Sequence, residues 1–230
     1  MQGTLRPGTG GLALYWTALT TTPIGRWYLN SLVTSGGVTL IVLAISAPCG
    51  YAISQLKFTG RRALWWLILA SFLIPVQSLI VNHFLLMNTL GLINTWAGVI
   101  LPQLIAPVTV IVYKRFFDAV PRELRDAAAL DGAGPWQMLL RLYLPLNRGV
   151  TAALGIIVFI GAWNAFLWPF LVVTKSEKMN ISVAIVQTQD YIRASQITAS
   201  LLAALPVAIF YLLFQRRVTH AVMMAAGLKG

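Results

Sequence analysis

The chain has 230 residues, of which 58% are hydrophobic and only 10% are charged, and its formal net charge is +11. Soluble domains carry about 25% charged residues, so this composition excludes an ordinary water-soluble domain and predicts a protein whose surface faces lipid. The positive charge does not indicate a nucleic-acid-binding protein, because Lys and Arg lie in short clusters between long uncharged stretches, as they do in membrane proteins.

Five stretches are long and apolar enough to cross a bilayer, for which about 20 residues are needed. None contains Asp, Glu, Lys or Arg, and their internal Pro and Gly residues are tolerated in transmembrane helices because neighbouring helices satisfy the freed backbone groups. We therefore predict an all-α fold, a polytopic transmembrane helical bundle with five visible spans. The spans are expected at Ser31–Ile53, Ala63–Leu86, Trp96–Tyr113, Gly149–Val173 and Ile197–Phe214.

The basic residues predict how these spans are oriented. Twelve of the 17 follow the first, third and fifth spans, and five lie on the other side. By the positive-inside rule the first group is cytoplasmic, which places the N-terminus outside and the C-terminus inside. Since residues 1–30 contain neither a span nor a signal-peptide core, we expect a preceding span to be missing. The chain then divides into an external segment 1–26, a transmembrane domain 27–217 and a cytoplasmic tail 218–230.

The cytoplasmic loop 114–148 contains the most informative pattern. Pro121 suits a first helical turn, Glu123 lies near the positive end of the helix dipole, and Arg122 can pair with Asp126 at the i, i+4 spacing. Three alanines at 127–129 leave a strip with almost no side chain. A turn at 132–135, which contains two glycines and a proline, then reverses the chain before a second amphipathic segment at 136–144. The pattern is typical of a close docking surface, although an ordinary charged interfacial loop is the alternative.

This loop resembles the "EAA" motif of binding-protein-dependent ABC importer permeases. The motif is Glu-Ala-Ala, three residues, Gly, nine residues, Ile, one residue and Leu-Pro. Here its spacing is matched from Asp126 through Gly132 to Leu142 and Pro145, with Asp in place of the motif's Glu and Leu142 in place of its Ile. The shorter acid at 126 puts in question whether this carboxylate reaches the same partner.

The resemblance extends over most of the chain, to the carbohydrate-type permeases that include the maltose and glycerol-phosphate systems. Members of that subclass have six spans, which agrees with a missing first one. The similar segments are Pro23–Leu32, Phe58–Leu64, Leu90–Pro102, Trp163–Thr174 and Gln215–Gly230.

The resemblance implies the type I ABC importer fold and a multi-pass subunit of the bacterial inner membrane. In such importers the loop helix is a coupling helix seated on an ATPase dimer, a second homologous permease completes the pathway, and an extracytoplasmic solute-binding protein delivers the substrate. The expected transport substrate is a sugar or polyol-type solute. The residues expected to couple to the ATPase are Arg122, Glu123, Arg125, Asp126, Ala127, Ala128, Ala129, Asp131, Gly132, Ala133, Leu144 and Pro145.

The sequence itself indicates that energy comes from a partner. There is no phosphate-binding loop of the Walker type, and the only ionisable residue within the five spans, apart from Tyr and Cys, is His83, whereas proton-coupled carriers use intramembrane acids and histidines. We therefore expect no catalytic residue, no metal and no cofactor in this chain, with ATP and Mg²⁺ on the partner.

Polar and aromatic residues within the spans are candidates for the solute pathway, because rings stack on sugars and amides bond hydroxyl groups. The alternatives are structural roles: Trp residues can lie in the belts at the membrane interfaces, and Asn and Gln can form hydrogen bonds between helices. The candidates are Gln77, Asn82, Trp163, Asn164 and Trp168, with His83 a weaker one.

Three other functions are alternatives. One is an ABC permease for phosphate, amino acids or peptides. A membrane-embedded enzyme would need a nucleophile–base pair or a metal cluster, and the sequence contains no paired acids or His-rich helix. A purely structural scaffold would leave the loop pattern unexplained.

Overall fold

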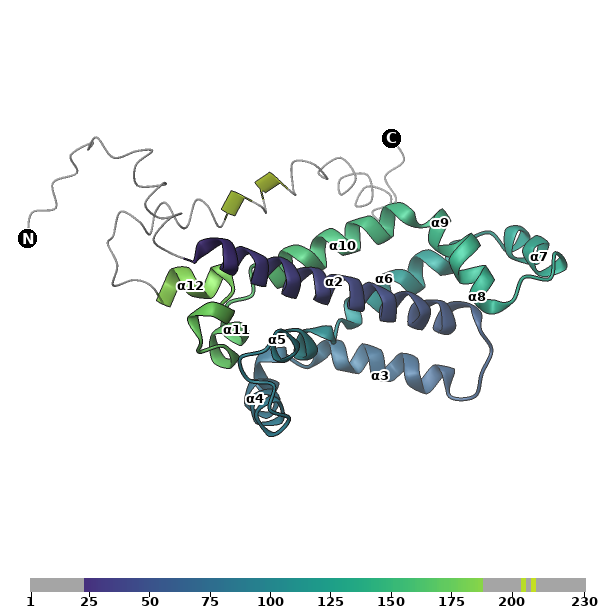
Figure 1. Cartoon of the computed structure of the whole chain (residues 1–230). Helices are drawn as coiled ribbons and strands as arrows, with labels where there is room; N and C mark the ends of the chain where they lie inside the picture. Colours follow the sequence, from purple (N-terminus) through teal and green to yellow (C-terminus); the bar gives the residue numbers. More distant parts are fainter. Residues whose placement is uncertain (1–22, 188–203, 206–207, 210–230) are drawn as a thin grey trace, which may run out of the picture.

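The computed structural model describes residues 23–187, 204–205 and 208–209, and in these parts the chain forms helices and turns without strands (Figure 1). This confirms the predicted all-α class. The α-helices are α2 Ile24–Gln55, α3 Arg61–Leu73, α4 Ile80–Thr89, α5 Trp96–Ile100, α6 Pro107–Asp118, α7 Arg122–Leu130, α8 Pro135–Met138, α9 Leu144–Leu146, α10 Arg148–Trp163, α11 Leu167–Val172 and α12 Ile181–Gln187. Short 3-10 helices span Val76–Leu79, Leu101–Leu104 and Ser176–Lys178, and a π-helical turn spans Leu139–Tyr143.

The long helix α2 is the centre of the bundle, where it packs against α6 and α10 (Figure 1). Gly50 permits the contact with α6, because a Cβ atom there would lie 2.8 Å from the Cβ of Tyr113 and 3.2 Å from the carbonyl oxygen of Val110. Helix α3 also packs against α6. No residue of α3 is buried, and Leu67 and Leu73 are 66% and 79% exposed. This apolar, uncovered helix is what a lipid-facing element requires.

The spans differ from the predicted ones mainly in being bent. By length and composition, α2 alone can cross a membrane as one helix, and the described residues provide up to four spans if each bent pair is counted as one. The predicted second span is divided at Pro75, with an angle of 89° between its halves, and the third is bent by 50° before Pro107. Both breaks follow from proline chemistry, since Pro lacks an N–H and pushes the residue before it out of the helical region.

The predicted fourth span, Gly149–Val173, is also interrupted. Helix α10 ends at Trp163, and α11 begins at Leu167 after a short connection. At its other end α10 meets the segment 135–146 at an angle of 81°. The predicted fifth span, Ile197–Phe214, lies almost entirely outside the described residues.

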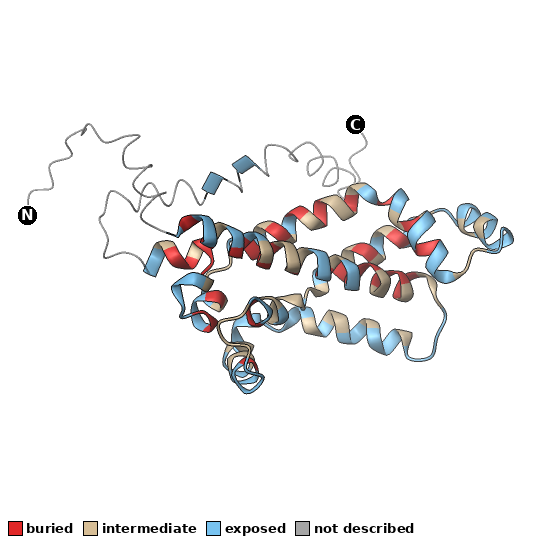
Figure 2. Ribbon diagram, in the orientation of Figure 1, coloured by how far each residue is buried: buried red, intermediate tan, exposed pale blue. Residues whose placement is uncertain are grey.

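Two main clusters of buried side chains lie at opposite ends of the bundle (Figure 2). One is centred on Trp163 and joins α2 to α10, α11 and α12. The other contains, besides further apolar side chains, four aromatic residues: Tyr51 from α2, Tyr113 and Phe117 from α6, and Tyr143 from the π-helical turn. Their ring centroids are 5.0 to 6.4 Å apart, at separations typical of aromatic packing. We call this second group the aromatic cluster.

Candidate functional site

Helix α7 and the turn after it form a hairpin that projects from the bundle at the end where α2 stops and α3 begins (Figure 1). Gly132 has φ +80°, a conformation that L side chains rarely adopt. Its N–H donates to the carbonyl of Ala129, and the N–H of Ala133 donates to the carbonyl of Ala128, which closes the helix in a glycine-terminated cap. The glycine turn predicted from the sequence is therefore confirmed. We call residues 122–138 the α7 hairpin.

The inner side of the hairpin rests on the aromatic cluster, against which Ala128 and Ala133 pack. Small side chains are needed there because they let the hairpin backbone approach the rings. Its outer side is exposed and partly apolar: Leu130 is 90% exposed, Trp136 66% and Leu124 43%. Exposed large apolar side chains on an otherwise charged hairpin are typical of a protein-docking surface.

The charges of the hairpin pair differently from the expectation. The predicted partner of Asp126 was Arg122, but its carboxylate accepts hydrogen bonds from Nε and Nη2 of the adjacent Arg125, at 3.0 and 2.8 Å. The hydrogen bond to Asp126 raises the pKa of the Arg125 guanidinium. Both side chains remain accessible, so they are available to an external partner.

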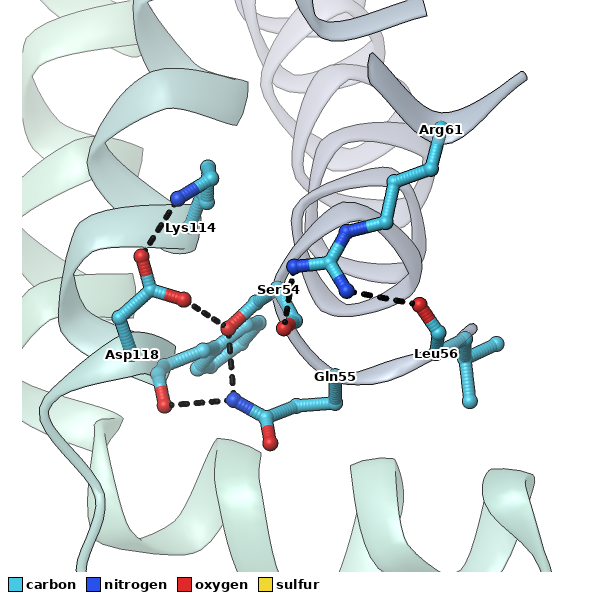
Figure 3. A network of polar contacts seen from close by, with 7 residues as sticks. Ser54, Gln55, Leu56, Arg61, Lys114 and Asp118 are labelled. Carbon is cyan, nitrogen blue, oxygen red and sulfur yellow. Dashed lines mark hydrogen bonds and ion pairs between the residues drawn. The ribbon is translucent and has the colours of Figure 1, made fainter. Parts of the chain in front are cut away.

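A polar network ties together three helices at the base of the hairpin (Figure 3). Ser54 Oγ on α2 donates to Asp118 Oδ1 on α6 at 2.6 Å, and Lys114 forms an ion pair with the other carboxylate oxygen of Asp118. Gln55 Nε2 donates to Ser54 Oγ and to the carbonyl of Phe117. Arg61 donates to the carbonyls of Ser54 and Leu56, which attaches the start of α3. The segments beneath the hairpin are thereby fixed relative to one another.

A cavity of about 550 Å³ lies between α2, the 3-10 turns before α4 and α6, α10 and α11. Most of its lining is apolar, and Val38 and Ala162 contribute to it from α2 and α10. The polar and aromatic side chains that line it are Gln77, His83, Gln103, Phe166 and Trp168. The rings of His83 and Trp168 meet edge to face, with centroids 6.0 Å apart. A mostly apolar cavity with a small number of polar side chains is typical of a small-molecule binding site.

The predicted pathway residues fall into two groups. Gln77 and Trp168 line the cavity, as does the weaker candidate His83. Asn82 and Asn164 are exposed outside its lining, and Trp163 is 1% exposed within the core, where it stacks on Phe159.

Gln103 was missed by the sequence reasoning, although it was the one amide within the third predicted span. Its Nε2 donates to the carbonyl of Val99 at 2.8 Å, which leaves the amide oxygen as an acceptor for another group.

The opposite end of the bundle is held by a buried amide. Asn30, 2% exposed, donates to the carbonyls of Glu177 and Met179, and its oxygen accepts from the indole N–H of Trp96. Asn94, at φ 62°, accepts from the backbone N–H groups of Thr174 and Lys175. Both amides therefore fix the segment that follows α11, so that the wall of the cavity formed by α11 is connected to α2 and α5.

Comparisons with known proteins agree with this architecture. Residues 41–222 match the model of a family described as "Binding-protein-dependent transport system inner membrane component". The chain is 32% identical to the diacetylchitobiose uptake system permease protein NgcG of Streptomyces coelicolor, covering 90% of this chain and 71% of the relative. It is 31% identical to the sn-glycerol-3-phosphate transport system permease protein UgpE of Agrobacterium fabrum, covering 83% and 70%.

Two solved structures share the fold. One is a bacterial ABC transporter involved in the import of the acidic polysaccharide alginate, with a TM-score of 0.79, 20% identity and coverage of 88% of this chain and 78% of that chain. The other is a bacterial alginate ABC transporter in complex with an alginate pentasaccharide-bound periplasmic protein, with a TM-score of 0.67, 21% identity and coverage of 90% and 84%.

Proposed function

The chain belongs to the family of binding-protein-dependent transport system inner membrane components, and from this premise we propose that it is a permease subunit of an ATP-driven importer for a sugar or polyol-type solute. Members of this family are transport components and not enzymes. The substrate class is supported by two relatives, a permease of a diacetylchitobiose uptake system and a permease of an sn-glycerol-3-phosphate transport system.

The α7 hairpin is the proposed contact with the ATPase. Its motif-like sequence, its glycine cap and above all the 90% exposure of Leu130 support this role. Burial of an exposed leucine by a partner protein would contribute favourably to the free energy of binding. The partner would be an ATPase dimer that holds ATP and Mg²⁺, and a second permease subunit would complete the pathway. A solute-binding partner is supported by the alginate transporter, whose complex includes a periplasmic protein.

The orientation follows from the same proposal. The hairpin, the start of α3 and the end of α6 lie together at one end of the bundle (Figure 1). With Lys57 before α3 and Arg141 and Arg148 after the hairpin, they contain nine of the twelve basic residues of the described part of the chain. That end would be cytoplasmic, and the end with Asn94 and Lys175 would face outward.

The cavity is proposed to form part of the solute path. The face of Trp168 would stack on a sugar ring, and the amides of Gln77 and Gln103 would bond hydroxyl groups. Roles for Asn82, Trp163 and Asn164 in the path stay predictions.

The coupling role can be tested with Leu130→Glu in the assembled transporter. The variant should insert normally but lose most of its ATPase subunit on co-purification, and transport should fall by at least tenfold, because a charge would replace the buried contact. Leu90→Glu is the matched control: Leu90 is 57% exposed at the end of α4, away from the hairpin, and should retain the ATPase. Normal co-purification and transport by Leu130→Glu would refute the docking role.

A further inference from the structure

A second cavity, of about 660 Å³, lies between the start of α3 and the end of α6 and is lined by basic side chains. Arg61 and Arg62 contribute to it from α3, and Lys114 contributes from α6. Trp65 completes the wall, with the Lys114 ammonium 4.9 Å from the centre of its ring. None of these residues belongs to the α7 hairpin or to the cavity of the proposed solute path.

The charges of this cavity are only partly neutralised. Lys114 is paired with Asp118, and Arg61 is bound to two backbone carbonyls, which are dipoles and leave its charge uncompensated. Arg62 is exposed, and no ion pair or hydrogen bond to another described residue is formed by its side chain. Three cations against one carboxylate leave a positive hollow, and the positive end of the α3 dipole adds to it. Such a hollow favours an anion with several acceptor oxygens, for which arginine forks are suited.

The surroundings of the cavity select an anion that has an apolar part. From the cavity, α3 continues with Leu64, Trp66 and Leu67, which are 38%, 61% and 66% exposed. Phe58, which also lines the cavity, is 41% exposed. A tryptophan at the boundary between charged and apolar surface is typical of the membrane interface. We propose that this cavity binds the phosphate headgroup of an anionic phospholipid, whose acyl chains lie along the exposed face of α3.

The ligand is a lipid in this proposal because one continuous surface offers both parts of it. A free phosphate would use the cations but would leave the apolar face of α3 uncovered. Arg62 is the residue to substitute in a test, since it lines the cavity and its side chain forms no bond to another described residue that a substitution would break. Lys114 is unsuitable because its replacement would also release Asp118 from the network in Figure 3.

The experiment is native mass spectrometry of the full chain released from detergent micelles that contain phosphatidylglycerol or phosphatidylcholine. The unsubstituted protein should retain one phosphatidylglycerol in preference to phosphatidylcholine. Arg62→Gln should weaken that retention about fivefold, the factor that corresponds to about 1 kcal/mol for one cation at a membrane surface. Arg62→Glu should abolish the preference.

Arg115→Gln is the matched control, because Arg115 is an exposed arginine of the same part of α6 that does not line the cavity. It should leave retention unchanged. An equal loss in Arg62→Gln and Arg115→Gln would show general attraction to charge and refute the site. Displacement of the lipid by millimolar inorganic phosphate would show that the cavity takes a free anion, which would also refute the lipid assignment.

Discussion

The contact of α2 with α6 at Gly50 permits a sharp test of the structure, through the substitution Gly50→Ala. The added Cβ would lie 2.8 Å from the Cβ of Tyr113 and 3.1 Å from the backbone nitrogen of Lys114. Ordinary contacts between carbon atoms are about 3.5 to 4.0 Å, so α6 would have to move by roughly 0.7 Å or more. Backbone atoms cannot rotate away as the end of a side chain can.

Two opposing terms determine the size of the effect. Overpacking of a tight contact costs about 1–3 kcal/mol, and here the cost is in the upper part of that range, about 2–3 kcal/mol, because the contacted atoms cannot rotate away. Replacing a glycine inside a helix returns about 1 kcal/mol of helix propensity. The net loss is therefore about 1–2 kcal/mol. For a chain of about 150–250 residues, 1 kcal/mol corresponds to about 2–4 °C in Tm, so Tm should fall by about 2–8 °C. The shift would also stretch the hydrogen bond from Ser54 to Asp118, one turn further along α2.

The assay is thermal unfolding of the full chain in detergent, followed by size-exclusion chromatography. Gly36→Ala is the matched control, since Gly36 lies inside the same helix with nothing within 4 Å of its Cβ position, and its Tm should be unchanged or higher. If the two variants have the same Tm, α2 and α6 are not in the close contact described here.

Two further predictions concern the buried amide and the cavity. Asn30→Asp should lower Tm by several degrees, since the carboxylate cannot donate to the carbonyls of Glu177 and Met179. Asn82→Asp, at an exposed site, is the control and should leave Tm unchanged. Equal unfolding curves for the two variants would refute the buried network. Trp168→Ala should lower solute uptake into proteoliposomes at least tenfold, while co-purification of the ATPase stays normal. Trp66→Ala, on the exposed face of α3, is the control and should transport normally. Unchanged uptake by Trp168→Ala would show that the cavity is not part of the solute path.

The hairpin was the part of the molecule most completely predicted from the sequence. Its helix, its glycine turn and its second segment depend on local chemistry: a proline before the first turn, and a glycine at Gly132 where φ is positive. What the sequence did not reveal is the side on which each alanine lies. Ala128 faces the aromatic cluster, whereas Ala127 and Ala129 are exposed, and this depends on rings supplied by α2 and α6.

The first four predicted spans coincide with helices of the described residues, but their shape was not predicted; the fifth lies almost entirely outside the described residues. The hydropathy of Ala63–Leu86 is continuous across Pro75, so hydropathy averaged along the sequence predicts one helix. The structure instead has two helical segments on either side of Pro75, at an angle of 89° to each other. Likewise α2 begins at Ile24, earlier than the predicted Ser31. The additional turns contain Arg26 and Asn30, which a search for uncharged apolar residues passes over, and Asn30 is stabilised there by carbonyls about 150 positions away in the chain. Contacts at such separations leave no local signal.

The arrangement of α2 explains how a hairpin and a distant cavity can act together in the proposed importer. Tyr51 of α2 belongs to the aromatic cluster under the hairpin, and Val38 of the same helix lines the cavity. At 1.5 Å per residue, about 20 Å of uninterrupted helix separates them. Because the Ser54–Asp118 hydrogen bond ties α6 to the same end of α2, a partner that moves the hairpin would tilt α2 and α6 as a unit. The helix breaks at Pro75 and before Pro107 lie beside the cavity. They are then the positions at which the other segments that line the cavity can bend.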